Sequence, residues 1–361
     1  MSGAGCFSEL PVGVNWWSAR FLVEGGGAAA LDRIAATGLE GYQLGSVREI
    51  SATLDPGELR EVREHAAGSS FYLEGGLPCI DASRPDPELL ASGDGDLRRG
   101  LEAHLRALAA VLEGSDAIRT SMGLPGDRAA AGAGWGARWG EMAAATRRLL
   151  RDVLPLLEEL DLRIAIENHG DGRTAELVEL VAGVDPERCG ICLDTANLAL
   201  SLEDPEEATA RVAGHVFATH LKDGVLVDDG AGGLTLHARA CGEGVFPLAE
   251  LIEALRDGGA SPRTLTVEDH DGLFPIACGD PEFVRGLAPS AAESAAIEEL
   301  RSRSQRLIGT GELPSVEALE ADPWQLQGPQ RMARAAEFVR AATGRDEALR
   351  RGTDRPGGGT R

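Results

Sequence analysis

The stretch RIAIENHGDGRTAELVELVAG, residues 163–183, contains the pattern that decides the fold. It begins with an apolar run of β-favouring residues that ends in a polar and glycine cluster. A helical segment follows and ends at a glycine, as helix C-termini commonly do. The next apolar run, GICLDTAN at residues 190–197, comes after a short turn. A strand, a helix and a second strand in this order predict parallel pairing through a right-handed crossover.

The same unit recurs along most of the chain. A doubly wound sheet is one fold built from such units, but it normally carries a Gly-rich phosphate turn after its first strand, and VNWWSARF, residues 14–21, is not one. Eight units within about 290 residues instead predict a (β/α)8 barrel, which typically needs about 250 residues and accepts insertions. The eight predicted strands lie at residues 12–17, 41–45, 70–76, 117–123, 163–170, 190–197, 216–224 and 264–270.

The pattern changes beyond residue 285. Two further helical segments lie at residues 290–309 and 329–344, with DPWQLQ between them, and the Gly- and Arg-rich end is typical of a disordered tail. We therefore expect a barrel domain at residues 1–285, a helical C-terminal extension at 286–345 and a disordered tail at 346–361. The extension is expected to pack against the outside of the barrel, with a subunit arm in a homo-oligomer or a cover over the site as alternatives.

Composition limits the partners. The net charge of −23 and the lack of a basic patch argue against nucleic acids and anionic membranes. No apolar stretch reaches the 18 residues that a membrane span needs. The six cysteines are scattered and the N-terminus shows no targeting pattern, so we expect a reducing, cytoplasmic location.

Four of the predicted strands end in residue types that bind metals. Glu167 follows IAI, Asp194 follows ICL, His220 follows VFAT and Glu268 follows LTV, the last after a long loop predicted at about residues 224–246. The C-terminal ends of barrel strands converge on one face, so these side chains are expected to meet. Without a cation, three carboxylates would repel one another or take up protons. The set predicts one divalent ion, with Mn²⁺, Mg²⁺ or Co²⁺ favoured and Zn²⁺ also admitted.

These motifs resemble a known family. IENHG, LDTAN, THLKD and LTVEDH, the last preceded by GEGVFPLAELIEALRDGG, are similar to the xylose isomerase-like TIM barrels, which include sugar isomerases and epimerases, inosose dehydratases and endonuclease IV. The resemblance covers about residues 10–285. It implies that Glu167, Asp194, His220 and Glu268 hold one catalytic divalent metal. It also implies that Glu167 and Glu268 exchange protons with a sugar substrate from opposite sides.

The chemistry of the residues agrees with this resemblance. A keto-sugar or aldose offers adjacent oxygens to a metal, which stabilises the enediolate formed when a glutamate removes the α-proton. Return of the proton gives an isomerase or epimerase, and expulsion of a β-oxygen gives a lyase or dehydratase acting on a keto-sugar, keto-glycoside or inosose. An endonuclease IV-like phosphodiesterase is disfavoured, since the resemblance places a histidine where this chain has Asn197. A non-catalytic sugar-binding protein is the remaining alternative.

Several neighbouring side chains are candidates for substrate binding. His169 and His270 stand two positions after each glutamate, where they would bind hydroxyls or relay protons, with a packing role as the alternative. Lys222 stands two positions after His220 and would bind a hydroxyl or an enolate oxygen, unless it forms a simple ion pair with an acid.

The remaining candidates lie at other strand ends. Asn197 is expected to hydrogen-bond the substrate. Arg119 and Glu74 would orient it, with a structural ion pair as the alternative. Trp16 would stack on a sugar ring or fill the core.

Overall fold

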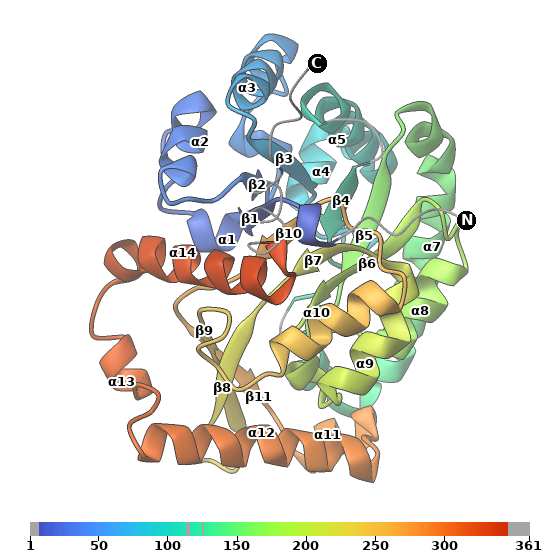
Figure 1. Ribbon diagram of the computed structural model, residues 1–361. Coiled ribbons are helices and arrows are strands. Elements are labelled where there is room, and N and C mark those ends of the chain that lie inside the picture. The colour runs from blue at the N-terminus through green and yellow to red at the C-terminus, as the bar shows by residue number, and fades with distance from the viewer. Residues whose placement is uncertain (1–6, 113–115, 125, 346–361) are drawn as a thin grey trace, which may run out of the picture.

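The computed structural model describes residues 7–112, 116–124 and 126–345 (Figure 1). The predicted disordered tail at 346–361 lies outside these residues. No helix in the described part of the chain has both the length and the apolar character needed to cross a lipid bilayer.

The predicted barrel is confirmed. Eight parallel strands are hydrogen-bonded in the order β10-β1-β2-β3-β4-β5-β6-β7 in the described residues. Leu221, the residue after β7, forms a parallel bridge with Val267, the last residue of β10. This bridge brings the two edges of the sheet together, so that the sheet forms a barrel. The strands are β1 Val12–Asn15, β2 Gly41–Gln43, β3 Tyr72–Gly76, β4 Ala117–Thr120, β5 Arg163–Glu167, β6 Cys189–Asp194, β7 Val216–His220 and β10 Leu265–Val267.

Helices surround the barrel (Figure 1). Several begin with an aspartate whose carboxylate accepts the first free backbone N–H groups, as Asp55 does before α3 and Asp204 before α9. The α-helices up to β10 are α1 Trp16–Ala19, α2 Gly27–Ala35, α3 Pro56–Gly68, α4 Pro87–Ser92, α5 Leu97–Val111, α6 Asp127–Ala131, α7 Trp135–Glu159, α8 Thr174–Ala182, α9 Pro205–Val212 and α10 Leu248–Asp257. Short 3-10 helices lie at Phe7–Glu9, Val47–Glu49, Gly132–Gly134, Asn197–Ser201 and Ala213–His215.

The prediction of a single long loop at residues 224–246 is wrong in one respect, because residues 224–228 and 234–239 form strands. β8 Asp223–Asp228 and β9 Leu234–Arg239 form an antiparallel hairpin, and β11 Leu273–Ile276 pairs with β9. All of β9 and the first four residues of β8 are buried, since one face of this small sheet meets the barrel rim and the other meets a C-terminal helix.

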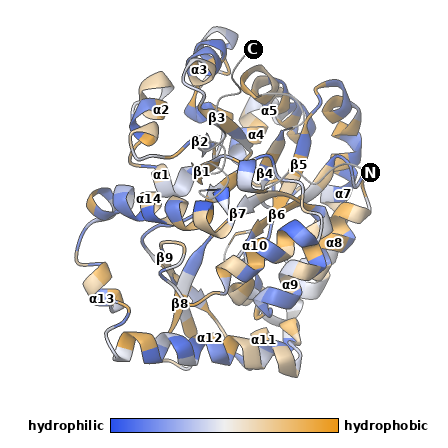
Figure 2. Cartoon of the chain, viewed as in Figure 1, coloured by the Kyte–Doolittle hydropathy of each residue, from blue (hydrophilic) through white to orange (hydrophobic). Residues whose placement is uncertain are grey.

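The two predicted C-terminal helices are present as α12 Ala291–Gly309 and α14 Trp324–Ala342, and both lie outside the barrel. Two shorter helices in this region, α11 Pro281–Leu287 and α13 Val316–Leu319, are not predicted from the sequence. α12 packs on β8, where the Ser304 hydroxyl accepts the Leu226 backbone N–H at 2.9 Å. Hydrophobic and hydrophilic residues are interspersed along α12 and α14, as expected of helices with one buried face (Figure 2).

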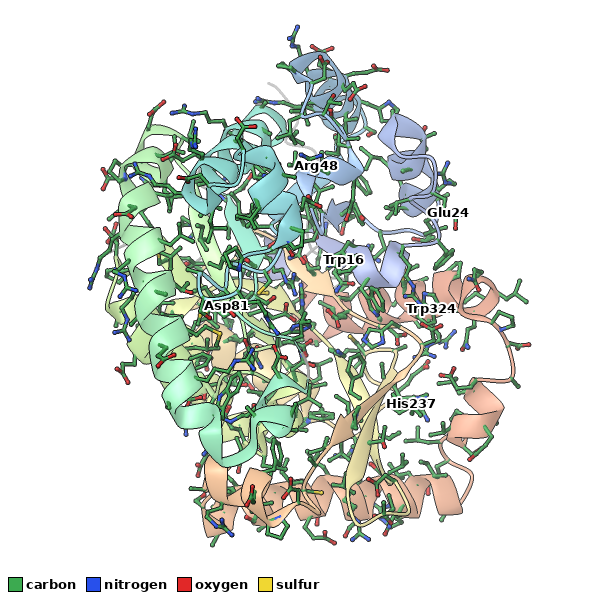
Figure 3. The ribbon with its side chains drawn as sticks, turned by 180° about the vertical axis from the view of Figure 1, so that it is seen from behind. Trp16, Glu24, Arg48, Asp81, His237 and Trp324 are labelled. Carbon is green, nitrogen blue, oxygen red and sulfur yellow. The ribbon has the colours of Figure 1, made fainter. Side chains whose placement is uncertain are left out.

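α14 packs on β1 and β10, and its apolar side chains belong to the main core. It begins earlier than predicted, because the segment DPWQLQ supplies its first turn instead of a linker. Trp324 is buried there and donates its indole N–H to the Ser18 carbonyl oxygen at 2.9 Å (Figure 3).

Candidate active site

The four predicted metal ligands meet at the C-terminal ends of their strands. Glu167, Asp194 and His220 are the last residues of β5, β6 and β7, and Glu268 directly follows β10. Each offers one ligand atom, and these atoms all lie within 4.8 Å of one another. All four side chains are buried. The barrel thus gathers three carboxylates and one imidazole into a group that could hold a metal ion.

Hydrogen bonds orient His220 for this role. Its Nε2 lies 2.5 Å from the Gln43 side-chain oxygen, and its Nδ1 lies 3.2 Å from Glu167 Oε1 and 2.9 Å from Glu268 Oε2. Because an amide oxygen only accepts hydrogen bonds, Nε2 carries the hydrogen. Nδ1 is then the ring nitrogen that faces the carboxylates, which is the arrangement of a metal-ligating histidine with a supporting partner.

Two of the four side chains have pKa values that are shifted from their usual range. Burial raises the pKa of Asp194 to about 7, against the pull of the Lys222 ammonium, and Glu268 and Glu167 add to the rise. Burial alone would lower the pKa of His220, but the Cys192 thiol and the two glutamates raise it well above its usual value. A divalent ion would relieve both effects, so the donor set fits a hard or borderline cation.

Each glutamate also has a cationic partner. Arg119 Nε donates to Glu167 Oε2 at 2.5 Å, and Lys222 Nζ lies 2.8 Å from Glu268 Oε1. Asn15 donates its side-chain amide to the other Glu268 oxygen. Burial raises the pKa of both glutamates, but the neighbouring cations outweigh it and hold both pKa values below their usual range. Both side chains are therefore ionised and able to accept protons at neutral pH.

Lys222 lies inside the cluster. Its side chain is buried. The ammonium nitrogen lies 3.2 Å from Asn197 Oδ1, 3.4 Å from Asp194 Oδ2 and 4.7 Å from the centre of the Phe274 ring. Burial lowers the pKa of Lys222, but Asp194 and Glu268 raise it above its usual value. The structure thus places Lys222 and Asn197 together beside the cluster. Lys222 forms the ion pairs with acids that the sequence analysis gives as its alternative role, and it supplies a fixed positive charge there.

The two histidines that follow the glutamates differ in placement. His169 lies at the cavity, with Nδ1 3.2 Å from the Gly123 carbonyl oxygen. His270 is buried behind Glu268, with Nε2 3.3 Å from Glu268 Oε1 and its ring against Phe274. His169 is therefore placed to contact a substrate, whereas His270 is placed to support the Glu268 side chain.

Glu74 is not brought to the cavity. It lies within β3, two residues before the end of that strand, and so projects into the barrel interior. There it accepts hydrogen bonds from the hydroxyls of Thr266 at 2.6 Å and Thr264 at 3.1 Å. Burial raises its pKa to about 7. His237, in the long segment after β7, is likewise remote from the cavity and lies 2.8 Å from Arg239 Nη1 in the small sheet (Figure 3).

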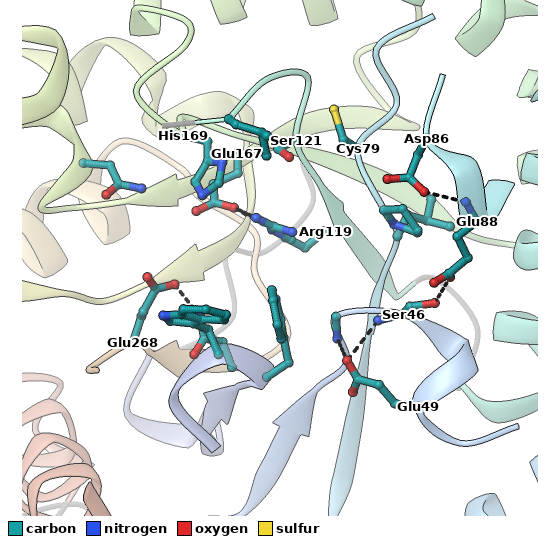
Figure 4. A pocket seen from close by; sticks show the side chains of 18 of the residues that line it. Ser46, Glu49, Cys79, Asp86, Glu88, Arg119, Ser121, Glu167, His169 and Glu268 are labelled. Carbon is teal, nitrogen blue, oxygen red and sulfur yellow. Dashed lines mark hydrogen bonds and ion pairs between the residues drawn. The ribbon is translucent and has the colours of Figure 1, made fainter. Parts of the chain in front are cut away.

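A cavity of about 700 Å³ adjoins the cluster (Figure 4). Both glutamates line it. Among the predicted substrate-binding residues, those that also line it are Trp16, Arg119, His169, Asn197 and Lys222.

Two site residues are not predicted from the sequence. Gln43 and Asn15 are the last residues of β2 and β1, and each hydrogen-bonds a metal-ligand side chain. The signal was their place at a strand end, which is the same signal that identifies the four ligands. Amides are also common in turns, so position alone did not single them out.

Comparisons with known proteins agree with the geometry. The chain is 30% identical over 109 residues to 3-oxo-isoapionate decarboxylase of Pectobacterium atrosepticum, an alignment that covers 30% of this chain and 40% of that relative's length. Among solved structures, D-psicose 3-epimerase in the presence of D-fructose has a TM-score of 0.58 at 16% identity, covering 93% of this chain and 100% of that one.

A xylose isomerase-like TIM barrel protein from Mycobacterium smegmatis in complex with magnesium has a TM-score of 0.52 at 14% identity, covering 82% and 98%. At these identities the structural likeness shows the fold. The family model described as xylose isomerase-like TIM barrel matches residues 31–301, which is most of the chain. The chain therefore belongs to the xylose isomerase-like TIM barrel family.

Proposed function

We propose that the protein is a divalent-metal-dependent isomerase or epimerase of keto-sugars or aldoses. The observation that carries the proposal is the placement of Glu167 and Glu268. Their carboxylates approach the same His220 nitrogen from strands on different sides of the cluster, at 3.2 and 2.9 Å, and both face the cavity. Two ionised carboxylates beside one metal-type donor set suit proton removal next to a carbonyl and proton return at another position.

The ion supplies electrostatic stabilisation of the negative charge that develops on the substrate oxygens. The oxygen-rich donor set suits Mn²⁺, Mg²⁺ or Co²⁺ and also admits Zn²⁺. The Glu268 carboxylate takes or returns the α-proton on one side and the Glu167 carboxylate on the other. The Lys222 ammonium and the Arg119 guanidinium, each held by one of these glutamates, provide fixed positive charge beside the reacting carbons.

A sugar lyase is the second candidate. Removal of the same proton leads to elimination when the next carbon carries a leaving group, and the relative from Pectobacterium atrosepticum is named a decarboxylase, which also breaks a bond beside a carbonyl. The ligand residues alone do not distinguish the two reactions. The fate of the substrate does.

The test combines metal analysis with hydrogen exchange. Purified protein loaded with Mn²⁺ should bind about one ion per chain, and it should exchange deuterium from heavy water into the α-carbon of D-fructose, D-tagatose or another keto-sugar. Glu268→Gln should lower the exchange rate by about 10²–10⁴-fold, the usual range for loss of a general base. Exchange without elimination supports an isomerase or epimerase, whereas loss of water or of an aglycone supports the lyase.

The matched control is Glu74→Gln, which alters a buried carboxyl that does not line the cavity. It should change the exchange rate much less than Glu268→Gln. The opposite order of the two variants, or exchange that is indifferent to chelators, would contradict the proposal.

A further inference from the structure

The cavity extends well beyond the metal cluster. At one end it is lined by Glu167, Glu268 and Arg119. The other end is lined by Ser46, Glu49, Asp86 and Glu88, which come from the loops after β2 and β3 and from the start of α4 (Figure 4). The two groups of side chains face each other across the cavity.

One sugar ring leaves much of this space empty. A volume of about 700 Å³ lies in the upper part of the range for pockets that enclose drug-sized ligands. A keto-sugar whose reacting carbons lie between Glu167 and Glu268 is held at the metal end. Its substituents that point along the cavity then approach the loops after β2 and β3.

The far end has the chemistry to bind hydroxyl groups. Asp86 Oδ1 accepts the Glu88 backbone N–H at 2.8 Å, and Glu88 Oε1 lies 3.1 Å from His104 Nε2 and accepts the Ser46 hydroxyl. Within the described residues, the second oxygen of each carboxyl, Asp86 Oδ2 and Glu88 Oε2, has no hydrogen bond. Ionised carboxylates only accept hydrogen bonds, so these oxygens suit the hydroxyls of a polyol.

An aromatic wall belongs to the same cavity. Trp16 packs directly against the backbone of Gly45, where a Cβ would lie 2.6 Å from the indole ring. The absence of a side chain at Gly45 thus permits this contact, and Trp16 and Ser46 both line the cavity. An aromatic side chain beside carboxylates is suited to a ring that has apolar C–H faces and polar edges.

We propose that the natural substrate consists of two linked rings, with a keto-sugar at the metal end and a second hydroxyl-bearing ring, such as a further sugar unit, at Asp86 and Glu88. This inference rests on the proposed function, because the metal end must first hold a sugar. It adds the substrate class: a glycosylated sugar instead of a free monosaccharide.

The test measures equilibrium binding to the Mn²⁺-loaded protein by calorimetry. The ligands are D-fructose and four disaccharides in which glucose is attached to fructose through different oxygens: turanose, maltulose, leucrose and isomaltulose. At least one disaccharide should bind about tenfold more tightly than D-fructose, as one or two additional hydrogen bonds to charged groups would provide. A benzyl ether of D-fructose at the same oxygen should not reproduce the gain.

The variant Asp86→Asn tests where the second ring lies. Asparagine caps a helix as well as aspartate, so α4 should be retained, while the free acceptor oxygen is replaced by a donor. The variant should lose most of the disaccharide's advantage and leave D-fructose binding unchanged. Asp96→Asn is the matched control, since Asp96 caps α5 in the same way but is exposed and lies outside the cavity.

The outcomes separate this inference from the proposed function. If D-fructose binds as tightly as every disaccharide, or if Asp86→Asn affects both ligands equally, the two-ring substrate is overturned and the metal-dependent reaction stands. If the benzyl ether matches the best disaccharide, the second ring is held by apolar contact and the hydroxyl-bearing ring is overturned. If no sugar binds, the proposed function fails together with the inference.

Discussion

Gln43 hydrogen-bonds His220, one of the four candidate metal ligands. Its amide oxygen fixes the His220 tautomer at a distance of 2.5 Å. We expect Gln43→Leu to lower Mn²⁺ affinity by about 10–100-fold, as loss of a supporting partner of a ligating histidine typically does. The measurement is competition with a chelating dye. Gln305→Leu is the control, because Gln305 is exposed on α12 and bonds Asp228, and it should leave affinity unchanged. Equal affinities for both variants would show that His220 needs no orientation.

The sequence identifies the four candidate ligands because each directly follows an apolar run that forms a barrel strand. Position at a strand end places such a residue on the rim wherever the strand truly stops there. For Glu74 it does not, since β3 continues through Gly75 and Gly76 and leaves the carboxyl one layer deeper. Strand ends are hard to locate from sequence when glycines follow, because glycine continues a strand and begins a turn equally well.

At the level of single helices and strands, α14 supports the loop that carries Glu268. Arg331 of this helix donates to both carboxylate oxygens of Asp269, the residue after Glu268, and both side chains are buried. Asp269 also donates its backbone N–H to Ser18 Oγ at 2.9 Å. The C-terminal extension therefore holds β10's end in place from outside the barrel.

Removal of this arginine should be costly. Arg331→Leu leaves the buried Asp269 carboxylate without its partner, which typically costs about 3–5 kcal/mol of unfolding free energy. Denaturation in urea measures the loss. Arg334→Leu on the same helix removes an ion pair to Glu243 in which both side chains are more than 40% exposed, and it should cost less than about 1 kcal/mol. Adding Asp269→Asn to Arg331→Leu should recover part of the stability, and no recovery would argue against the charge as the cause.

The end of α14 predicts a pH dependence. Burial raises the pKa of Glu40, but its hydrogen bonds and nearby positive charges outweigh burial and lower the pKa below its usual value. The Glu40 carboxylate accepts hydrogen bonds from Arg345 at 2.5 and 2.6 Å and from the Val12 N–H at 3.0 Å. The charges come from Arg345 and Arg340. A carboxyl whose pKa is lowered by folding stabilises the fold above its unfolded pKa, and this stabilisation is lost as pH falls through the folded value.

The comparison is between the native chain and Glu40→Gln. At pH 7 the native chain should be the more stable in urea, and the difference should shrink below about pH 4.5, the ordinary pKa of glutamate, and vanish in stronger acid. A difference that persists at low pH would mean that the Glu40 charge contributes nothing to it.

The small sheet shows why some elements escape sequence analysis. GVLVDDGAGGLTLHAR contains two alternating runs around a turn rich in Asp and Gly, which is a hairpin pattern. It lies where a barrel is expected to carry a loop, and the third strand, β11, comes from beyond the next barrel strand. Pairing between segments so far apart depends on the closed barrel, which brings the ends of β7 and β10 together.

Across the folded chain, the barrel and α14 share one core. Met332, Ala335 and Val339 are completely buried in the same apolar cluster as the barrel strands. We expect Met332→Ala to cost about 2–5 kcal/mol, and Leu326→Ala, at a side chain that is 67% exposed on the same helix, to cost at most about 0.5 kcal/mol. Circular dichroism and tryptophan fluorescence should report one common transition in urea. Two separate transitions would show that the extension folds independently.

The chain's architecture was largely predictable, because alternation of apolar runs and helical segments is a local signal that repeats eight times. For the C-terminal helices the sequence predicts packing outside the barrel, but not that α12 packs on β8 and α14 on β1 and β10, since an amphipathic pattern does not identify the partner of the apolar face. The domain boundary predicted at residue 285 stays a prediction. Because α14 and the barrel share one hydrophobic core, we expect the two parts to unfold together even though the sequence pattern changes at that point.

The small sheet has a consequence for how such a protein can diversify. β8 begins three residues after His220 and β11 five residues after Glu268, and both pair with β9. The distance between these two side chains is therefore constrained twice, by the barrel ladder and by the small sheet. The loops after β2 and β3 belong to neither. During evolution those loops can change, and so admit new molecules, without moving the candidate metal ligands, so substrate range and chemistry can vary independently.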